Sequence, residues 1–577
     1  MQKSSEIENI RHSFAHILAA AVKKFYPKAQ LGIGPVIENG FYYDFGNLQL
    51  ANKDLPRIEK EMRSIASQNL LFKKELWPNA KATTHFKKEK QPYKLELIKD
   101  LKAKKVGMVY TGDLFLDLCR GGHVKNTSEL PLNAFKLTHL AGAYWRGDEK
   151  RPMLTRIYGL AFETKQELDN HLKLLEEARE RDHKKIGKEL DLFSFHQEAP
   201  GFIFWHPKGM LLRKALMSLH EELHQKAGYQ QVSTPILLSE ELWKKSGHWD
   251  HYKESMYFTK IDNRTFAIKP MNCPGTILIY KTKPRSWREL PLRLAEAGEV
   301  HRHEPSGTLN GLFRVRAFRQ DDTHIFAKED QVAEEVKGVI TLTLTFYRII
   351  GFRDVEIELS TRPEHSIGTD AMWRKAEGAL KRVLKDLRLP YKINKGDGAF
   401  YGPKIDFHIK DLLGRSWQCG TIQLDFAMPE RFDVTYVDKD GKLKRPVIIH
   451  RTVLGSIQRF TGILIEHYKG AFPLWLAPEQ IWILPISDQF VPFANTILKT
   501  LQEKNKNLRV AVRDENETLG KKIREGEMQK IPYLLIVGEK EQQTNTVSVR
   551  QRKKGNLGQM NMAEFSKRVE EEINSKI

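Results

Sequence analysis

Charged and polar side chains crowd residues 300–326, VHRHEPSGTLNGLFRVRAFRQDDTHIF. The stretch reads as two strands on either side of a turn rich in Gly, Pro and Asn, which predicts a long antiparallel hairpin. Residues two apart on a strand share a face, so the first strand would present Arg302 and Glu304 together. The second would present one face made of Arg314, Arg316, Phe318, Gln320, Asp322 and His324. A solvent-exposed edge hairpin would have a similar composition, but we favour a floor that holds a polyanion at one end and a small polar molecule at the other.

The order of these residues resembles motif 2 of the class II aminoacyl-tRNA synthetases, in which an FRxE strand and a loop precede a second arginine. The resemblance implies that Arg302 holds the α-phosphate of ATP and is catalytic. It further implies that Glu304 accepts a hydrogen bond from the adenine amino group and that Arg314 holds the γ-phosphate. Attack of a carboxylate on the α-phosphorus builds negative charge, and a fixed guanidinium binds phosphate without reorganising.

Length and composition limit the possible classes of protein. A chain of 577 residues exceeds what one hydrophobic core usually serves, so we expect three or four domains. Three cysteines argue against a disulfide framework and favour a reducing cytoplasm. No signal peptide or membrane-spanning run stands out. The net charge of +21 indicates a nucleic-acid or anionic-membrane partner, and the absence of a long basic amphipathic helix favours nucleic acid.

Two pairs of metal-ligand residue types lie near the N-terminus. Residues 5–26 have helical periodicity, which places His12 and His16 on one face of a helix. Such a pair alone is more often incidental than a site. The segment DLCRGGH supplies a second pair at the same spacing, Cys119 and His123, and the four residues together form a possible ligand set.

This constellation resembles the editing domain of threonyl- and alanyl-tRNA synthetases. The resemblance implies hydrolysis of a wrongly charged aminoacyl-tRNA in a pocket lined by His12, His16, Lys94, Asp117, Cys119 and His123. Four ligand-type residues would permit zinc, but we expect the pocket to position water without a metal. Gly122 stands where the bacterial threonyl motif usually has proline. The chain begins almost at the first editing helix, so we expect the small N-terminal domain common in bacterial threonyl enzymes to be absent.

Two more stretches resemble class II motifs. A predicted helix over 210–230, followed by a strand that contains Pro235, is similar to motif 1, which builds the dimer interface in that family. The segment 455–468, GSIQRFTGILIEHY, is similar to motif 3, in which Arg459 would pack on adenine and reach the γ-phosphate. Three motifs in this order predict a class II core built on an antiparallel sheet, and a homodimer.

Cys273, His324 and His450 each fall beside a different class II element. Singly, such residues are usually part of a core. In the class II fold these elements converge on one pocket, and a thiolate with two imidazoles is a plausible zinc set that leaves coordination positions open. The match is to the threonyl-tRNA synthetases, which implies one zinc ion per subunit.

The chemistry of such a site explains why an editing domain would accompany it. An open zinc ion can bind threonine through its amino and hydroxyl groups, and a site built for a hydroxyl rejects valine by orders of magnitude. Serine lacks only a methyl group, a difference of about 1–3 kcal/mol, which is too small for translation. A second, hydrolytic site is therefore expected, and the N-terminal residues supply one.

Further roles follow from the same resemblance. Asp322 would bind the amino group of L-threonine. The rest of the threonine pocket would comprise Gln320, Tyr401 and Gln423. Lys404 would sit near the phosphates of ATP, which bring Mg²⁺, and Gln418 and Thr421 would flank ATP. His248 matches a histidine thought to assist transfer to the terminal ribose, and Thr276 stands where histidine is usual.

The last hundred residues alternate short apolar runs with helical patterns, which predicts a small α/β domain with a mostly parallel sheet. It resembles the anticodon-binding domain shared by the threonyl, prolyl, histidyl and glycyl enzymes. By position, the residues that would contact anticodon bases are Asn516, Arg524, Glu541 and Arg550. Unpaired bases expose their edges to such contacts. Residues 549–556, VRQRKKGN, add positive charge for phosphate.

The sequence thus predicts a multidomain α+β enzyme that joins threonine to tRNA(Thr) and clears seryl-tRNA(Thr). The predicted parts are an editing domain (1–163), a linker helix (164–186), a catalytic domain (187–476) and an anticodon-binding domain (477–577). A prolyl or seryl enzyme would not need the Cys–His–His set. A non-catalytic synthetase-like RNA-binding regulator should have lost Arg302 or Arg314, and both are present.

Overall fold

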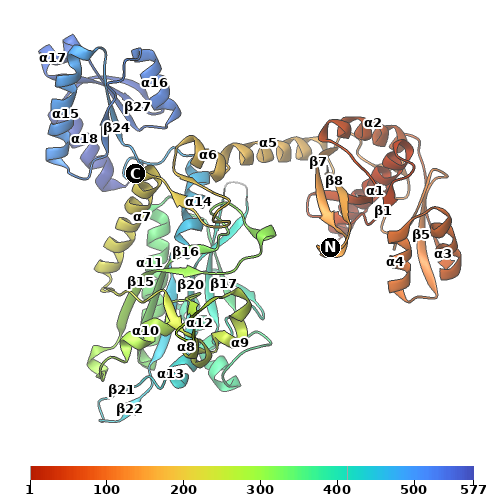
Figure 1. The fold of residues 1–577 in the computed structure, drawn as a ribbon, viewed down its shortest axis with the longest axis horizontal. Coiled ribbons are helices and arrows are strands. Elements are labelled where there is room, and N and C mark those ends of the chain that lie inside the picture. Colours follow the sequence, from red (N-terminus) through yellow and green to blue (C-terminus); the bar gives the residue numbers. More distant parts are fainter. Residues whose placement is uncertain (1, 412–413, 577) are drawn as a thin grey trace. The chain divides into compact units, whose positions relative to one another are not determined.

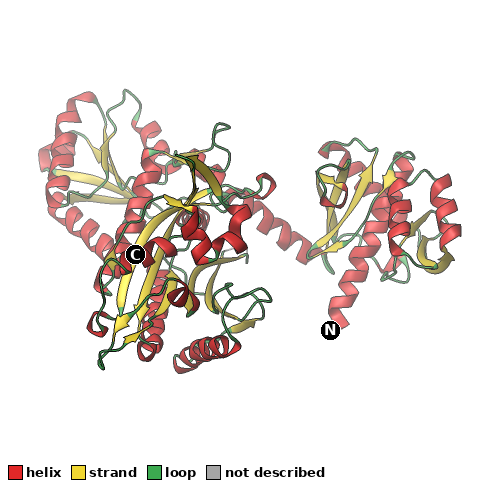
Figure 2. Cartoon of the chain, turned by 60° about the horizontal axis from the view of Figure 1, so that its bottom comes forward, coloured by secondary structure: helices red, strands yellow, loops and turns green. Residues whose placement is uncertain are grey.

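The computed structural model describes residues 2–411 and 414–576, with side chains from residue 6 onward. The chain divides into two compact units, Met1–Glu177 and Ala178–Ile577 (Figures 1 and 2). Helix α5 (Lys165–Arg181) contains the boundary. None of the helices in the described part of the chain has the length and apolar character that a bilayer crossing requires.

The first unit is built around helix α1 (Gln2–Phe25), whose buried side chains include Phe14, Leu18 and Val22. These residues share a core with an antiparallel sheet. Its strands are β1 (Gln30–Leu31), β2 (Val36–Ile37), β3 (Gly40–Gly46), β7 (Phe135–Tyr144) and β8 (Met153–Ala161). A second sheet consists of β4 (Phe72–Pro78), β5 (Lys105–Thr111) and β6 (Phe115–Leu118). The remaining helices are α2 (Leu55–Ala66), α3 (Asn79–Lys88) and α4 (Pro92–Leu101).

The single linker helix predicted over 164–186 is interrupted. Helix α5 ends at Arg181 and α6 (His183–Glu189) begins two residues later. Asp182 separates them because its carboxylate accepts a hydrogen bond from the Lys184 amide and so caps a new helix.

An eight-stranded sheet forms the centre of the second unit, in the order β11-β15-β16-β23-β20-β19-β17-β18. The strand bounds are β11 (Gln230–Gln231), β15 (Leu292–His301), β16 (Ala317–Ala327), β17 (Val355–Ser360), β18 (Lys392–Asn394), β19 (Lys404–Lys410), β20 (Ser416–Asp425) and β23 (Val447–Thr452). The six strands from β15 to β17 pair antiparallel, and the two edge strands pair parallel. Helices α7 (Pro207–Lys226), α11 (Val332–Ile349), α12 (Asp370–Asp386) and α14 (Ile457–Tyr468) share its core.

The predicted hairpin is only partly correct. Strands β15 and β16 pair antiparallel, but β15 ends at His301 and β16 begins at Ala317. Arg302, Glu304 and Arg314 therefore lie in the connection rather than on strand faces, because the Pro- and Gly-containing stretch forms a short 3-10 turn and open loop. The predicted strand around Pro235 is likewise reduced to β11 before it and β12 (Leu237–Ser239) after it.

The C-terminal part has a five-stranded sheet in the order β25-β24-β26-β27-β28. The first three strands in that order are parallel, as predicted, and the last two are antiparallel. Their bounds are β24 (Ile481–Pro485), β25 (Val510–Val512), β26 (Tyr533–Val537), β27 (Thr546–Gln551) and β28 (Gly555–Asn561). Helices α15 (Val491–Lys504), α16 (Leu519–Met528), α17 (Glu539–Thr544) and α18 (Met562–Ser575) complete it.

Candidate active site and editing site

Cys273, His324 and His450 converge beside the eight-stranded sheet. His324 on β16 lies directly opposite His450 on β23 in the strand register, and Cys273 is the first residue of helix α10 (Cys273–Tyr280). Their ligand atoms all lie within 4.8 Å of one another, and all three side chains are buried. Neither nitrogen of His324 has a hydrogen-bond partner among the residues that the structure describes. A buried imidazole with two unused nitrogens beside a thiol and a second imidazole fits a bound zinc ion.

Two carboxylates lie next to this set. His450 Nε2 is 3.0 Å from Asp425 Oδ2, and metal-binding histidines commonly donate their second ring nitrogen to such a carboxylate. Asp425 Oδ1 in turn accepts hydrogen bonds from two backbone amides. Asp322 Oδ2 accepts from the Asn272 amide at 3.2 Å, and burial raises the pKa of Asp322 to about 6. Nothing in the sequence pattern had identified Asp425.

The predicted threonine residues surround the same set. The Tyr401 hydroxyl donates to Gln423 Oε1, and the Tyr401 ring lies 5.0 Å from that of His450. Gln320 shares the β16 face with Asp322. The Nε2 atom of His248 is 3.7 Å from the Cys273 thiol. His248 is fully buried, and this burial lowers the pKa of its imidazole to about 3.

A neighbouring pocket of about 240 Å³ collects the residues predicted to bind ATP. They are Arg302, Glu304, Arg314, Gln418, Thr421 and Arg459, and Gln320 and Gln423 join them in the lining. Arg314 Nη2 pairs with Glu304 Oε2 at 2.8 Å, which ties the two ends of the loop together. Arg459 donates from Nε to the Phe313 carbonyl at 3.0 Å. Three guanidinium groups in one open pocket are suited to a polyphosphate.

Asp406 organises the outer wall of this region, although the sequence patterns did not single it out. It is buried on β19, and its carboxylate receives hydrogen bonds from Gln418 at 2.5 Å and Thr421 at 2.6 Å. Lys404 Nζ lies 2.6 Å from the same carboxylate. Burial alone would lower the pKa of Lys404, but Asp406 and Asp397 outweigh it and raise that pKa.

Asp321 lies behind the pocket that is predicted to bind ATP. It is buried on the face of β16 opposite to Asp322, and its carboxylate accepts hydrogen bonds from the backbone amides of Val453, Leu454 and Gly455 at 2.8, 3.0 and 2.8 Å. His220 Nε2 on α7 contacts the same carboxylate at 3.1 Å. Asp321 therefore fixes the turn that precedes the Arg459 helix, a role that depends on long-range contacts and has no local pattern.

A third acid–imidazole group supports the motif 2 loop. His183 Nδ1 donates to Glu466 at 2.8 Å, and its Nε2 accepts from the Leu312 amide at 2.9 Å. Both nitrogens are thus used, which makes this group unsuited to a metal. The His183 ring also packs 4.2 Å from the ring of Phe313, which lines the ATP pocket.

In the first unit His12, His16, Cys119 and His123 form a second cluster, with ligand atoms within 4.8 Å of one another. Here three of the four residues contact each other through polar atoms, and Nδ1 of the buried His16 has no hydrogen-bond partner among the described residues. The Cys119 thiol is 3.5 Å from His12 Nε2 and 3.3 Å from His123 Nε2. Burial raises the pKa of Cys119 and lowers the pKa of all three histidines, so the cluster is neutral at pH 7.

Lys94 and Asp117 form a buried ion pair of 2.6 Å beside the cluster, and the Tyr43 hydroxyl donates to the same carboxylate at 2.5 Å. Gly122 has φ +87°, a left-handed conformation that proline cannot adopt. Its carbonyl lies 3.2 Å from His12 Nδ1. The glycine at this position therefore sets a turn that contacts a cluster residue.

The predicted anticodon residues come from a loop, two helices and a strand of the C-terminal part. Asn516 and Arg524 are exposed, in the loop before α16 and on α16. Glu541 on α17 accepts from the Ser548 hydroxyl at 2.8 Å, and Arg550 on β27 pairs with Glu527 at 3.2 Å.

Comparison with known proteins agrees with this geometry. Residues 257–468 match the class II tRNA synthetase core domain (G, H, P, S and T), 480–572 an anticodon binding domain, and 106–158 the second additional domain of threonyl and alanyl tRNA synthetases. A threonine–tRNA ligase from Clostridium tetani is 54% identical over 571 residues, which cover 99% of this chain and 89% of that protein. The chain belongs to the threonine–tRNA ligases. The relative from Carboxydothermus hydrogenoformans is also 54% identical, over 98% of this chain and 89% of that protein.

Solved structures give the same answer. The RNA binding domain of threonyl-tRNA synthetase from Cryptosporidium parvum Iowa II has a TM-score of 0.65 at 39% identity, covering 68% of this chain and 98% of that one. Prolyl-tRNA synthetase from Giardia lamblia shares the fold, with a TM-score of 0.53 at 17% identity over 68% of this chain and 79% of that one. The predicted fold class and activity are confirmed: the enzyme charges tRNA with threonine and carries an editing domain.

Proposed function

We propose that Cys273, His324 and His450 bind one zinc ion per subunit and that this site selects threonine for activation. The observation that carries the proposal is the fully buried His324, which lacks hydrogen-bond partners among the described residues. Zinc bound there would ligate the amino and hydroxyl groups of threonine and so discriminate against valine. Asp322 binds the amino group, and Gln320, Tyr401 and Gln423 line the pocket.

In the proposed reaction Arg302, Arg314 and Arg459 hold the phosphates of ATP, which enters with Mg²⁺. Glu304 recognises adenine, Lys404 lies near the phosphates, and the remaining contacts come from Gln418 and Thr421. The Arg302 guanidinium would stabilise charge that develops at the α-phosphate. The role of His248 in transfer to the terminal ribose stays a prediction.

Editing follows from the same discrimination. Serine differs from threonine by one methyl group, so about 1–3 kcal/mol is available to exclude it. We place the hydrolysis of seryl-tRNA(Thr) at the neutral cluster of His12, His16, Cys119 and His123, where the imidazoles can position a water molecule and accept its proton. Lys94 and Asp117 would orient the substrate.

The partners of the proposed enzyme are tRNA(Thr) and a second copy of the chain. Asn516, Arg524, Glu541 and Arg550 would contact the anticodon, and α7 would build the interface of a homodimer. We also propose that the editing domain ends at residue 163, the linker helix at 186 and the catalytic domain at 476. The same proposal places the enzyme in the cytoplasm.

Threonine-dependent exchange of pyrophosphate into ATP tests the assignment. We expect exchange with threonine, weaker exchange with serine, and exchange with valine lower by orders of magnitude. Equal exchange with valine and threonine would overturn the zinc-based selection. No exchange with any amino acid would favour a non-catalytic RNA-binding regulator.

A further inference from the structure

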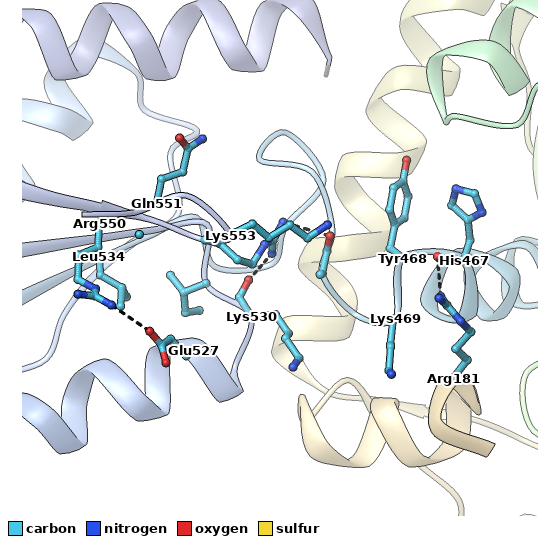
Figure 3. A pocket seen from close by; sticks show the side chains of 14 residues that line it. Arg181, His467, Tyr468, Lys469, Glu527, Lys530, Leu534, Arg550, Gln551 and Lys553 are labelled. Atoms are coloured by element: carbon cyan, nitrogen blue, oxygen red, sulfur yellow. Dashed lines mark hydrogen bonds and ion pairs between the residues drawn. The ribbon is translucent and has the colours of Figure 1, made fainter. Parts of the chain in front are cut away.

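A basic pocket of the second unit shares no lining residue with the pocket predicted to bind ATP. It has a volume of about 660 Å³ and lies where the end of α14 meets the C-terminal sheet (Figure 3). Six lysines and arginines line it, with one glutamate. One wall contributes Arg181 and Lys469, and the other contributes Lys530, Arg550, Arg552 and Lys553.

The walls of this pocket are held together by hydrogen bonds. Arg552 donates to the carbonyls of Ala471 at 3.1 Å, of Phe472 and of Lys530. Arg181 donates to the carbonyls of Glu466 and His467 at 3.1 and 3.2 Å. The acceptors of these hydrogen bonds are backbone carbonyls, which carry no net charge.

The positive charge of the pocket is only partly compensated. Arg550 pairs with Glu527, and Lys469 pairs with Glu180. Within residues 2–411 and 414–576, no carboxylate lies at ion-pair distance from the Lys530 or Lys553 ammonium group. Both lysines have a left-handed backbone, with φ of 59° and 69°, at the turns that border the pocket. Clustered cations without counter-ions repel each other and favour an anionic ligand.

We infer that this pocket binds backbone phosphates of tRNA on the path between the catalytic core and the anticodon-binding domain. The pocket lies at the junction of the two matched domains, 257–468 and 480–572, within reach of a tRNA that contacts both. Ammonium and guanidinium groups bind phosphate oxygens without reading the base sequence. The inference rests on the tRNA-charging activity and on the proposed anticodon contact.

A double variant, Lys530→Glu with Lys553→Glu, tests it in the full-length enzyme. Each phosphate contact contributes roughly 0.7–0.9 to the slope of log Kd against log salt, so we expect the slope for tRNA(Thr) to fall by about 1.5. We expect KM for tRNA to rise about tenfold. Pyrophosphate exchange, which needs no tRNA, should stay unchanged and shows that the variant is folded.

The matched control changes two exposed lysines of the same domain, Lys499→Glu with Lys506→Glu, and should leave the slope at its wild-type value. An unchanged slope in the pocket variant overturns the inference. Calorimetry gives a second test, with inorganic pyrophosphate as the probe. If pyrophosphate binds the wild type but not the variant while the affinity for tRNA is unaltered, the ligand is a free anion and the inference is overturned. If the proposed function is wrong, the wild-type enzyme will instead show pyrophosphate exchange that does not depend on threonine.

Discussion

The two Cys/His clusters of this enzyme use the same residue types under opposite conditions. Cys273, His324 and His450 are at most 4% exposed, and His324 has no hydrogen-bond partner among the described side chains and backbone. In the other cluster Cys119 lies within 3.5 Å of two imidazole nitrogens, and His12 and His123 are only partly buried. Both nitrogens of His324 in the first cluster lack a hydrogen-bond partner among the described residues. The second cluster leaves only Nδ1 of His16 buried and unpaired, and its His12 and His123 remain accessible to a substrate.

The largest effect should come from Cys273→Ala. It removes the thiolate of the proposed zinc set, so we expect threonine-dependent pyrophosphate exchange to fall more than about a thousandfold. The matched change in the other cluster, Cys119→Ala, should leave exchange at the wild-type rate. Comparable losses in both variants would contradict the different roles assigned to the clusters.

Changing His12 and His16 together to Ala should impair editing and leave threonine activation unchanged. General acid–base groups contribute about 10²–10⁴-fold, so deacylation of seryl-tRNA(Thr) should fall by at least about a hundredfold. Threonylation should continue at its normal rate. If the double variant still clears seryl-tRNA, the hydrolytic site lies elsewhere.

Asp425→Asn sharpens the comparison at the carboxylate that contacts His450. Loss of such a supporting carboxylate typically weakens metal affinity about 10- to 100-fold. Competition with a chromophoric zinc chelator measures the affinity, and Asp433→Asn, an exposed site that pairs with Arg445, is the control. Equal chelator sensitivity in both variants would show that Asp425 does not support the ligand set.

The smallest effect concerns the predicted ATP pocket. In Asp321→Asn an amide group faces backbone N–H donors, which costs about 1–3 kcal/mol. We expect KM for ATP to rise about tenfold while KM for threonine and the zinc content stay unchanged. A parallel rise in both KM values would indicate a general loss of structure rather than misplacement of the turn that carries Arg459.

Features of this site that depend on residues close in sequence could be predicted, whereas features that depend on residues distant in sequence could not. Local patterns identified α1 and the C-terminal α/β sheet, because spacing and residue type determine these features. The arginines of the predicted ATP pocket were identified through the resemblance to class II motifs. Residues 302–304 and 314–316, at the two ends of the loop between β15 and β16, were predicted as strand because their alternating charges imitate strand periodicity. Asp406, Asp425 and Asp321 were missed because each acts through partners distant in sequence, and only the fold brings these together.

The zinc content of freshly purified enzyme tests the central claim most directly. Elemental analysis of the wild type, Cys119→Ala and Cys273→Ala should give one zinc ion per chain in the first two proteins and none in the third. Active wild-type enzyme without zinc, or loss of zinc from Cys119→Ala alone, would contradict the account.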